Sequence, residues 1–213
     1  ELVKGAKAGA RLYRGARGLP KGEHTIELVK RTEAYAGSVR FVGVSLQGIL
    51  LDPPDRPTRR LEIIGDSISC GYGNESSIRV SDKFTEPNVG YFSKNEDISQ
   101  AYGSLLGRRF DAEVVSSCLS GTGVYRNNDG NTERAYPAQY LRVIPEQEEP
   151  VWDPSRYVPD VIVINLGNND FNVVDEEKLP TAPPAEPFKA AYAAFVRRLR
   201  EYYPAAHIIC SVG

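Results

Sequence analysis

LEIIGDSISCGYG fills residues 61–73 and joins a short apolar run to a turn of small polar residues. Three later stretches have the same texture of Val and Ile with little alternation: EVVSSCLSG at 113–121, DVIVINLGNND at 160–170 and AHIICSVG at 206–213. Apolar runs of this kind are typical of strands that are covered on both faces of a sheet. We therefore expect four strands of this kind.

Two stretches between these runs have helical periodicity. One apolar stripe covers residues 98–110, and a second recurs at spacings of three and four over residues 188–202. Pro187 stands at the start of the second stripe and Pro204 ends it, which is how proline marks helix boundaries. Strands that alternate with helices indicate an α/β fold with a parallel sheet and flanking helices.

The first sixty residues follow a different pattern. HTIELVK at 24–30 and SVRFVGVSL at 38–46 place apolar residues at near-alternate positions, which predicts short antiparallel strands. Three or four such strands do not close a sandwich or a barrel. We therefore expect part of a β domain whose beginning lies upstream of Glu1. The absence of Met from the chain agrees with this expectation.

A proline-rich stretch separates the two patterns. LDPPDRPTRR at 51–60 has three prolines within five positions, and proline fits neither a helix interior nor a central strand. We place the domain boundary there. Residues 1–55 are predicted to be the C-terminal part of a β-sandwich domain, and residues 56–213 are predicted to be the α/β domain.

The charge balance excludes some classes of partner. The 213 residues include 26 Lys and Arg against 28 Asp and Glu, which gives a net charge of −2. Nucleic acids and anionic membranes attract proteins with a clustered positive excess, so neither partner is expected. No apolar run approaches the roughly 20 residues needed to span a bilayer.

Small hydrogen-bonding residues follow three of the predicted strands. They are GDS at 65–67, SGTG at 120–123 and GNND at 167–170. Each motif alone has an ordinary explanation as a turn, a helix entry or an anion nest. Ligands of open α/β sheets bind outside the carboxyl ends of the strands, so three such motifs at successive strand ends indicate one site.

These residue types suit acyl transfer. Ser67, held on a turn directly after a strand, is placed to attack an acyl carbon if a base takes its proton. The backbone N–H groups of Ser67 and Gly121 and the side-chain amide of Asn169 can donate hydrogen bonds to the developing oxyanion. Asp66 and Asp170 flank these positions, and we expect them to hold the turns by hydrogen bonds.

The motifs resemble those of the SGNH (GDSL-type) hydrolases. Ser67 matches the first block of that family, Gly121 the second and Asn169 the third. The strings IGDSISCGYGNE, SGTGVYRN and VPDVIVINLGNNDF resemble the family 2 carbohydrate esterases in particular. That group joins an N-terminal β jelly roll to a flavodoxin-like SGNH domain, and HTIELVKRTEAYAGSVRF is similar to the end of its jelly roll.

The resemblance implies a function. It implies a secreted serine esterase that removes O-acetyl groups from xylan or glucomannan and needs no metal or organic cofactor. Two alternatives stay open: an SGNH lipase or thioesterase, and a carbohydrate-binding protein with an incomplete active site.

One block of the family is missing. The Asp-x-x-His expected near the C-terminus is not in this sequence, which has only two His. His24 lies in the β segment, and His207 stands at the start of a strand, at the opposite end of the sheet from Ser67. We therefore expect the general base to be a His beyond Gly213 and the α/β domain to be incomplete at its C-terminal end.

Aromatic residues near the motifs are candidates for sugar binding. Tyr72, Trp152 and Phe171 could offer ring faces to a saccharide, although we expect packing to be the more common use of each ring. The stretch of residues 72–97 is long for a strand-to-helix connection, and we interpret it as a loop on the substrate side.

The three Cys have two interpretations. Cys70, Cys118 and Cys210 can be three small buried residues, since free Cys packs like a small hydrophobe. Alternatively, Cys70 and Cys118 form a bridge, because each lies three positions from a motif residue and their strand ends can be neighbours.

Overall fold

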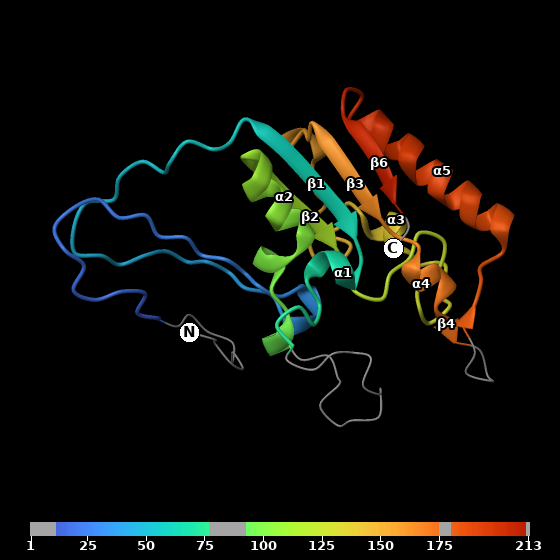
Figure 1. The fold of residues 1–213 in the computed structure, drawn as a ribbon, viewed down its shortest axis with the longest axis horizontal. Coiled ribbons are helices and arrows are strands. Elements are labelled where there is room, and N and C mark those ends of the chain that lie inside the picture. Colours follow the sequence, from blue (N-terminus) through green and yellow to red (C-terminus); the bar gives the residue numbers. More distant parts are fainter. Residues whose placement is uncertain (1–11, 77–92, 175–179, 212–213) are drawn as a thin grey trace.

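The chain folds around one parallel sheet. The computed structural model describes residues 12–76, 93–174 and 180–211. Four strands pair in the order β2-β1-β3-β6, all parallel: β1 (Arg59–Gly65), β2 (Ala112–Cys118), β3 (Val161–Asn165) and β6 (His207–Ser211). The predicted α/β fold, its four strands and their parallel arrangement are confirmed (Figure 1).

Helix α2 (Tyr102–Phe110) packs on one face of the sheet through two glycines. A Cβ at Gly103 would lie 2.7 Å from Cγ1 of Ile63, and one at Gly107 would lie 2.4 Å from Cγ2 of Val114. The helix predicted over residues 98–110 is divided into two separate helices. The short helix η3 (Ile98–Gln100) comes first, and the backbone at Ala101 is extended before α2 begins.

Helix α5 (Ala185–Tyr202) lies against the other face and covers the hydrophobic core. It begins two residues before the predicted start, so Pro187 lies in its first turn, where proline is tolerated. Its buried residues Phe195 and Leu199 belong to one cluster with residues of β1 and β3, and the ring of Phe195 meets those of Tyr136 and Tyr140 edge-on. The core comprises Ile64, Leu119, Val124, Tyr136, Tyr140, Ile162, Ile164, Leu166, Phe195, Leu199, Tyr203 and Ala206.

The other elements are short. Helices α1 and α4 follow β1 and β3 directly, and the two-stranded ribbon β4–β5 is antiparallel. These elements are η1 (Ala34–Ala36), α1 (Ser67–Cys70), η2 (Ser93–Asn95), α3 (Tyr136–Gln139), η4 (Pro154–Arg156), α4 (Asn168–Phe171), β4 (Val173–Val174) and β5 (Pro180–Thr181). In the described ranges, no helix is both long and apolar enough to cross a bilayer.

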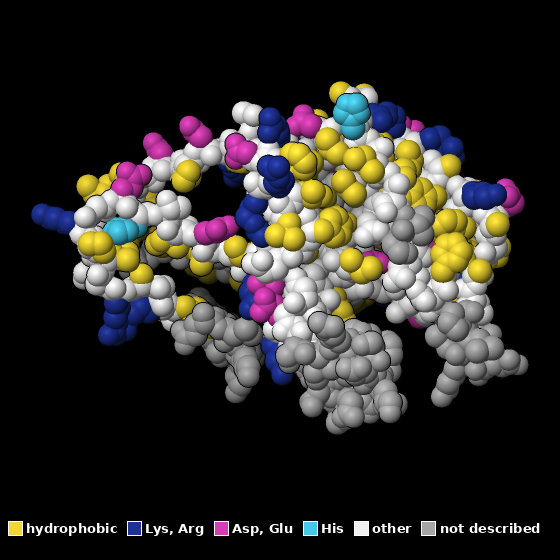
Figure 2. Space-filling model, viewed as in Figure 1, with side chains coloured by type: hydrophobic (Ala, Val, Ile, Leu, Met, Phe, Trp, Pro, Cys, Tyr) yellow, Lys and Arg dark blue, Asp and Glu magenta, His cyan; other side chains and the backbone are white. Residues whose placement is uncertain are grey.

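The strands are not covered equally. In β3, Ile162 and Ile164 are fully buried on the α5 side, whereas Val163 is half-buried on the other side. Ile209 of β6, which pairs with Val163, is 52% exposed. Figure 2 shows hydrophobic side chains gathered over this part of the molecule. The expectation that all four strands are covered on both faces is therefore wrong for β3 and β6 among the described residues.

The two strands predicted in the N-terminal segment are not formed. Between residues 12 and 58 the only regular element is η1, and the chain makes long loops beside the sheet (Figure 1). The apolar residues of 24–30 and 38–46 are exposed, for example Ile26 at 67% and Phe41 at 65%. An alternating pattern forms a strand only when a neighbouring strand accepts its hydrogen bonds, and none lies beside these residues in the described structure.

A buried carboxyl group lies in the middle of β1. Glu62 is 3% exposed and accepts hydrogen bonds from Tyr140 Oη at 2.9 Å and from Ser117 Oγ at 2.9 Å. Burial raises the pKa of Glu62, while the two hydroxyl donors oppose the shift. Burial and the charge of Glu62 likewise raise the pKa of Tyr140. We therefore expect this carboxyl group to make the stability of the sheet depend on pH.

Candidate active site

Ser67 is the first residue of α1, directly after the turn that ends β1. Asp66 is the N-cap of this one-turn helix, and its Oδ1 accepts the N–H of Ile68 at 3.0 Å. Gly71 ends the helix in a left-handed conformation with φ 83°. Ser67 is half-buried, and its hydroxyl has no hydrogen-bond partner among the described residues. The turn thus presents the hydroxyl at the carboxyl end of the sheet, as predicted for a nucleophile.

Gly121 lies beside this turn because β1 and β2 are neighbours. Gly65 pairs with Cys118, and the N–H of Leu119 donates to the carbonyl of Gly65 at 3.0 Å. Gly121 has φ 77°, a conformation that glycine adopts without steric cost. Its carbonyl accepts the N–H of Asn128 at 2.9 Å, whereas its own N–H has no acceptor in the part of the chain that the structure describes.

Asn169 joins the third strand end to the other two. It lies in α4, directly after β3, and is 7% exposed. Its Nδ2 donates to the carbonyl of Thr122 at 2.9 Å and to Oδ2 of Asp66 at 3.1 Å. The two hydrogens of this amide group therefore already have acceptors in the protein. To stabilise an oxyanion, Asn169 would have to share one of these hydrogens between its present acceptor and the oxyanion. The three predicted motifs meet at one edge, while the oxyanion role of Asn169 stays a prediction.

The two flanking carboxylates hold the turns. Oδ2 of Asp170 accepts the N–H of Val124 at 2.8 Å, and Oδ1 accepts those of Tyr125 at 2.7 Å and Arg126 at 2.9 Å. Asp170 is completely buried and fixes the loop that follows Gly121. Asp66 caps α1 and orients Asn169. Burial raises the pKa of Asp66, and the nearby charge of Asp170 adds to this effect. The predicted structural roles of both residues are confirmed.

Comparison with known proteins agrees with this geometry. The sequence pattern of the GDSL-like lipase/acylhydrolase family matches residues 63–213, which contain all three motifs. The chain belongs to this family. A second pattern, that of the N-terminal region of family 2 carbohydrate esterases, matches residues 2–54. The predicted boundary at 55/56 falls between the two matched ranges and stays a prediction.

Relatives of this GDSL-like chain have names that refer to carbohydrate esters. It is 36% identical over 197 residues to the cellulase/esterase CelE of Acetivibrio thermocellus, covering 92% of this chain and 22% of that protein. It is 32% identical to an acetylxylan esterase / glucomannan deacetylase of Cellvibrio japonicus, covering 90% of this chain and 50% of that protein. The chain thus spans half or less of the length of these relatives.

A solved structure shares the fold. It is a family two carbohydrate esterase from Clostridium thermocellum in complex with cellohexaose, with a TM-score of 0.74 and 35% identity. The match covers 86% of this chain and 52% of that one. The predicted resemblance to the family 2 carbohydrate esterases is confirmed.

A pocket of about 340 Å³ opens beside Gly121 in this family member. Tyr72, predicted to bind sugar, lines it and is 42% exposed. Tyr35, from the N-terminal segment, lines it too and was not found by sequence reasoning. No periodicity or motif links residues 35 and 121, so only the fold reveals this neighbour. The remaining lining residues are Ser120, Thr122, Asn127, Asn128 and Asp129.

The other two aromatic candidates have packing partners. Phe171 in α4 meets the ring of Phe188 edge-on at 5.3 Å between centroids, and it is 42% exposed. Trp152 lies 5.7 Å from the guanidinium of Arg156, and its backbone N–H donates to the carbonyl of Leu141 at 2.7 Å. Trp152 is not among the residues that line the pocket beside Gly121. Most of the predicted substrate-side loop of 72–97 lies outside the described residues.

Neither His reaches the catalytic edge. His207 is the first residue of β6 and pairs with Val161, at the end of the sheet opposite Ser67. His24 lies in the N-terminal segment, where its Nε2 is 2.9 Å from the carbonyl oxygen of Pro20. The prediction that neither residue serves as the base agrees with these positions.

A buried acidic cluster lies behind the nucleophile turn. Side-chain ligand atoms of Glu33, Cys70 and Glu96 lie within 4.8 Å of one another, and all three residues are buried. Oxygens of both carboxylates already accept protein hydrogen bonds, so no cation is needed to satisfy them. All three Cys are free, which does not agree with a bridge, but only Cys70 is buried, whereas Cys118 is partly buried and Cys210 is exposed. The first interpretation, three small buried residues, therefore holds for Cys70 and is wrong for Cys210. The neighbouring Cys118 thiol and burial raise the pKa of Cys70.

Proposed function

We propose that this chain is the catalytic part of a secreted serine esterase that removes acetyl groups from plant cell-wall polysaccharide. One observation carries the proposal. Ser67, Gly121 and Asn169 come from three strand ends and meet at one edge of the sheet, in a chain whose family is defined by acyl hydrolysis. The names of the relatives, which refer to acetylxylan and glucomannan, support the choice of substrate.

The proposed reaction is acyl transfer in two steps. The Ser67 hydroxyl oxygen attacks the acetyl carbon while its proton passes to a general base. The N–H groups of Ser67 and Gly121 and the amide of Asn169 stabilise the oxyanion. The tetrahedral intermediate then expels the sugar oxygen, which takes the proton back. Water, activated by the same base, releases acetate and regenerates Ser67. We propose a His outside residues 1–213 as this base, since His24 and His207 lie elsewhere.

The saccharide is proposed to bind beside Gly121. Tyr72 offers a half-exposed ring at the pocket, and Tyr35 adds a second aromatic ring. Aromatic rings suit the apolar faces of sugars, and the Asn and Ser side chains of the pocket can bond to hydroxyl groups. Phe171 is 42% exposed and can extend this surface. Trp152 is proposed to pack against Arg156 and Tyr203 instead.

Ser67→Ala in the full-length natural protein tests the proposal. We expect the variant to lose acetate release from acetylated xylan and from an aryl acetate. Ser155→Ala, which removes an exposed hydroxyl from η4, serves as the matched control and should keep full activity. A fluorophosphonate should label the wild type and not Ser67→Ala. Unchanged turnover by Ser67→Ala would refute the assignment, and faster hydrolysis of long-chain esters than of acetates would favour a lipase.

A second candidate is glycan binding without catalysis. It is favoured by the solved relative that is in complex with cellohexaose, because the name of that ligand describes an unacetylated glucan. Calorimetry with cellohexaose and acetylated xylo-oligosaccharides measures this binding. Binding together with absent fluorophosphonate labelling of the full-length protein would favour this second function.

A further inference from the structure

We propose that Glu33, in the N-terminal segment, is a positioning residue for the oxyanion donor at Gly121. This inference rests on the proposed esterase function and on the role assigned there to the Gly121 N–H. It gives the segment outside the α/β domain a part in the chemistry.

Glu33 accepts two hydrogen bonds from Ser120, the residue before the proposed oxyanion donor Gly121. The N–H of Ser120 donates to Oε2 of Glu33 at 2.7 Å, and the hydroxyl of Ser120 donates to Oε1. Glu33 is 6% exposed, so water does not compete strongly for these bonds. Hydrogen bonds to a carboxylate are shorter and about twice as strong as neutral ones. The carboxylate therefore holds both polar donors of Ser120 at once.

These two hydrogen bonds restrict the direction of the Gly121 N–H. That N–H belongs to the planar peptide unit whose carbonyl carbon is part of Ser120. Its direction is set by one torsion of Ser120 and one of Gly121. Glycine alone restricts its torsion little, since it populates positive φ freely. Asn128 fixes the far side of Gly121 by donating to its carbonyl at 2.9 Å. Glu33 supplies the restraint on the near side.

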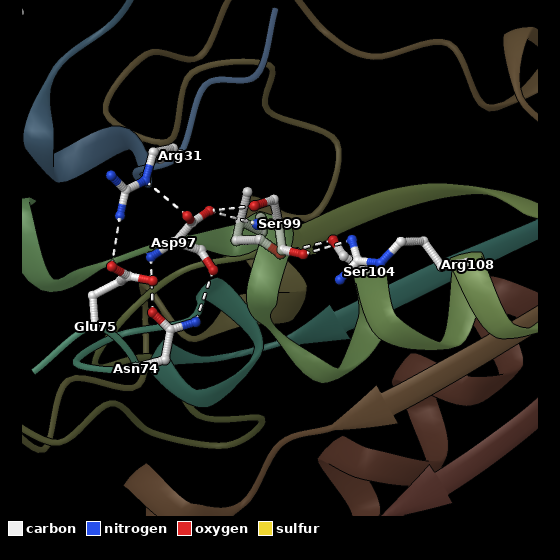
Figure 3. Close-up of polar contacts among 8 residues, drawn as sticks. Arg31, Asn74, Glu75, Asp97, Ser99, Ser104 and Arg108 are labelled. Carbon is white, nitrogen blue, oxygen red and sulfur yellow. Dashed lines mark hydrogen bonds and ion pairs between the residues drawn. The ribbon is translucent and has the colours of Figure 1, made fainter. Parts of the chain in front are cut away.

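Residues of the α/β domain hold Glu33 in place. Its backbone N–H donates to Oε1 of the buried Glu96 at 2.7 Å. Two residues earlier, Nε of Arg31 pairs with Oδ2 of Asp97 at 2.9 Å, and the carbonyl of Arg31 accepts the N–H of Ile98 at 2.9 Å. Figure 3 shows Arg31 and Asn74 both directed at Asp97, which joins the segment to the loop after α1. The carboxylate is thus anchored on a docked segment.

A carboxylate near an oxyanion needs a counter-charge. Lys30 donates to the backbone carbonyl of Glu33 at 3.0 Å. Burial lowers the pKa of Lys30, and the charges of Glu96 and Glu33 oppose this shift without cancelling it. The two donors of Ser120 and the nearby Lys30 are the groups that offset the charge of Glu33. The net effect of the carboxylate on the oxyanion is then orientation of its donor.

The test compares four variants of the full-length protein. Glu33→Ala should lower kcat for an aryl acetate by roughly 10²-fold and leave KM unchanged, as for a displaced oxyanion donor. Glu33→Gln should recover most of the loss, because its carbonyl can accept the Ser120 N–H and its amide can donate to the hydroxyl. Ser120→Ala keeps the N–H bond and should lose less than Glu33→Ala. Arg56→Met removes an exposed ion pair with Glu113 that takes no part in holding Glu33, and this variant should keep the wild-type kcat.

A second readout separates positioning from folding. A thionoacetate ester places sulfur, a weaker acceptor, where the oxyanion forms, so a well-aimed donor favours the oxygen ester. The ratio of kcat/KM for the oxygen ester to that for the thionoester should fall in Glu33→Ala and stay at the wild-type value in Arg56→Met. If Glu33→Ala fails to fold, Ser120→Ala decides: a wild-type ratio in that variant would overturn the proposal.

Two further results would also overturn it. One is a wild-type kcat and ratio in folded Glu33→Ala. The other is an equal loss in Arg56→Met, which would mean that the loss does not depend on the contacts of Glu33. An active Ser67→Ala variant would refute the proposed function instead, so the two failures are distinguishable.

Discussion

The amide nitrogen of Asn169 lies 3.1 Å from Oδ2 of Asp66, which joins residues 103 positions apart. Asp66 also caps the helix that begins with Ser67, so one carboxylate positions both the nucleophile turn and the Asn169 amide. A substitution at Asp66 can therefore affect catalysis and stability separately, according to which of its two bonds is kept.

Asp66→Asn should separate these two roles. Asn caps a helix about as well as Asp, so the free energy of unfolding should change little. With its oxygen on the Ile68 N–H, however, the new amide directs a donor at the donor of Asn169. We expect kcat for an aryl acetate to fall by roughly 10- to 100-fold as Asn169 moves. Steady-state kinetics and urea unfolding of the full-length protein measure the two effects.

Asp66→Ala is the matched comparison. It loses the cap and leaves the Asn169 amide without its acceptor, so unfolding should become easier by about 2 kcal/mol. Equal stability losses in the Asn and Ala variants, or full activity in Asp66→Asn, would contradict the two-role assignment.

The meeting of the three motifs could be predicted because each motif is local to its strand. A short run of Val and Ile that stops at Gly or Asn marks a strand and its end. Parallel pairing then brings those ends to one edge, and this is what places Asn169 against Asp66. Helix boundaries could not be predicted as closely, because proline fits the first turn of a helix as well as the position before it. Helix α5 begins at Ala185, two residues before Pro187.

Non-local contacts could not be predicted in this way. The bond between Ser120 and Glu33 spans 87 positions, and neither residue stands in a pattern that names the other. Alternating apolar residues in 24–30 and 38–46 indicate which side of a strand would be buried. They do not indicate which strand would pair with it, so the pattern alone does not predict a sheet. Trp152 was a candidate by residue type alone, and residue type does not say at which end of the sheet a loop lies.

Asp170→Ala should destabilise the protein strongly. Its carboxylate accepts three successive backbone N–H groups at 2.7–2.9 Å, and it is fully buried. Bonds to charged acceptors contribute about 1.5–3 kcal/mol each, so we expect a loss above about 3 kcal/mol by urea unfolding. Asp153→Ala removes an exposed carboxylate that accepts Ser155 donors and should cost much less. Similar losses in both variants would contradict the role of Asp170.

Gly121→Ala and Gly73→Ala form a matched pair with nearly equal φ values of 77° and 73°. A Cβ at 73 meets nothing within 4 Å, whereas one at 121 lies 3.1 Å from Oδ1 of Asn128. Both variants should lose about 1 kcal/mol of stability through the left-handed conformation. Only Gly121→Ala should also lose kcat, because crowding Asn128 turns the oxyanion donor. Thermal unfolding and aryl acetate kinetics measure this, and equal kcat values in the two variants would contradict it.

Glu62→Gln should flatten the dependence of stability on pH. Because the pKa of Glu62 is raised by burial, the folded state holds the proton more tightly than the unfolded state. This contribution is complete below the ordinary carboxyl pKa and is lost as the pH rises through the raised pKa of the folded protein. Urea unfolding at intervals between pH 4 and pH 8 should show a smaller fall in Glu62→Gln than in the wild type. Glu113→Gln removes a carboxylate paired with the exposed Arg56 at 3.0 Å and should keep the wild-type fall. An unchanged slope in Glu62→Gln would assign the pH dependence to another group.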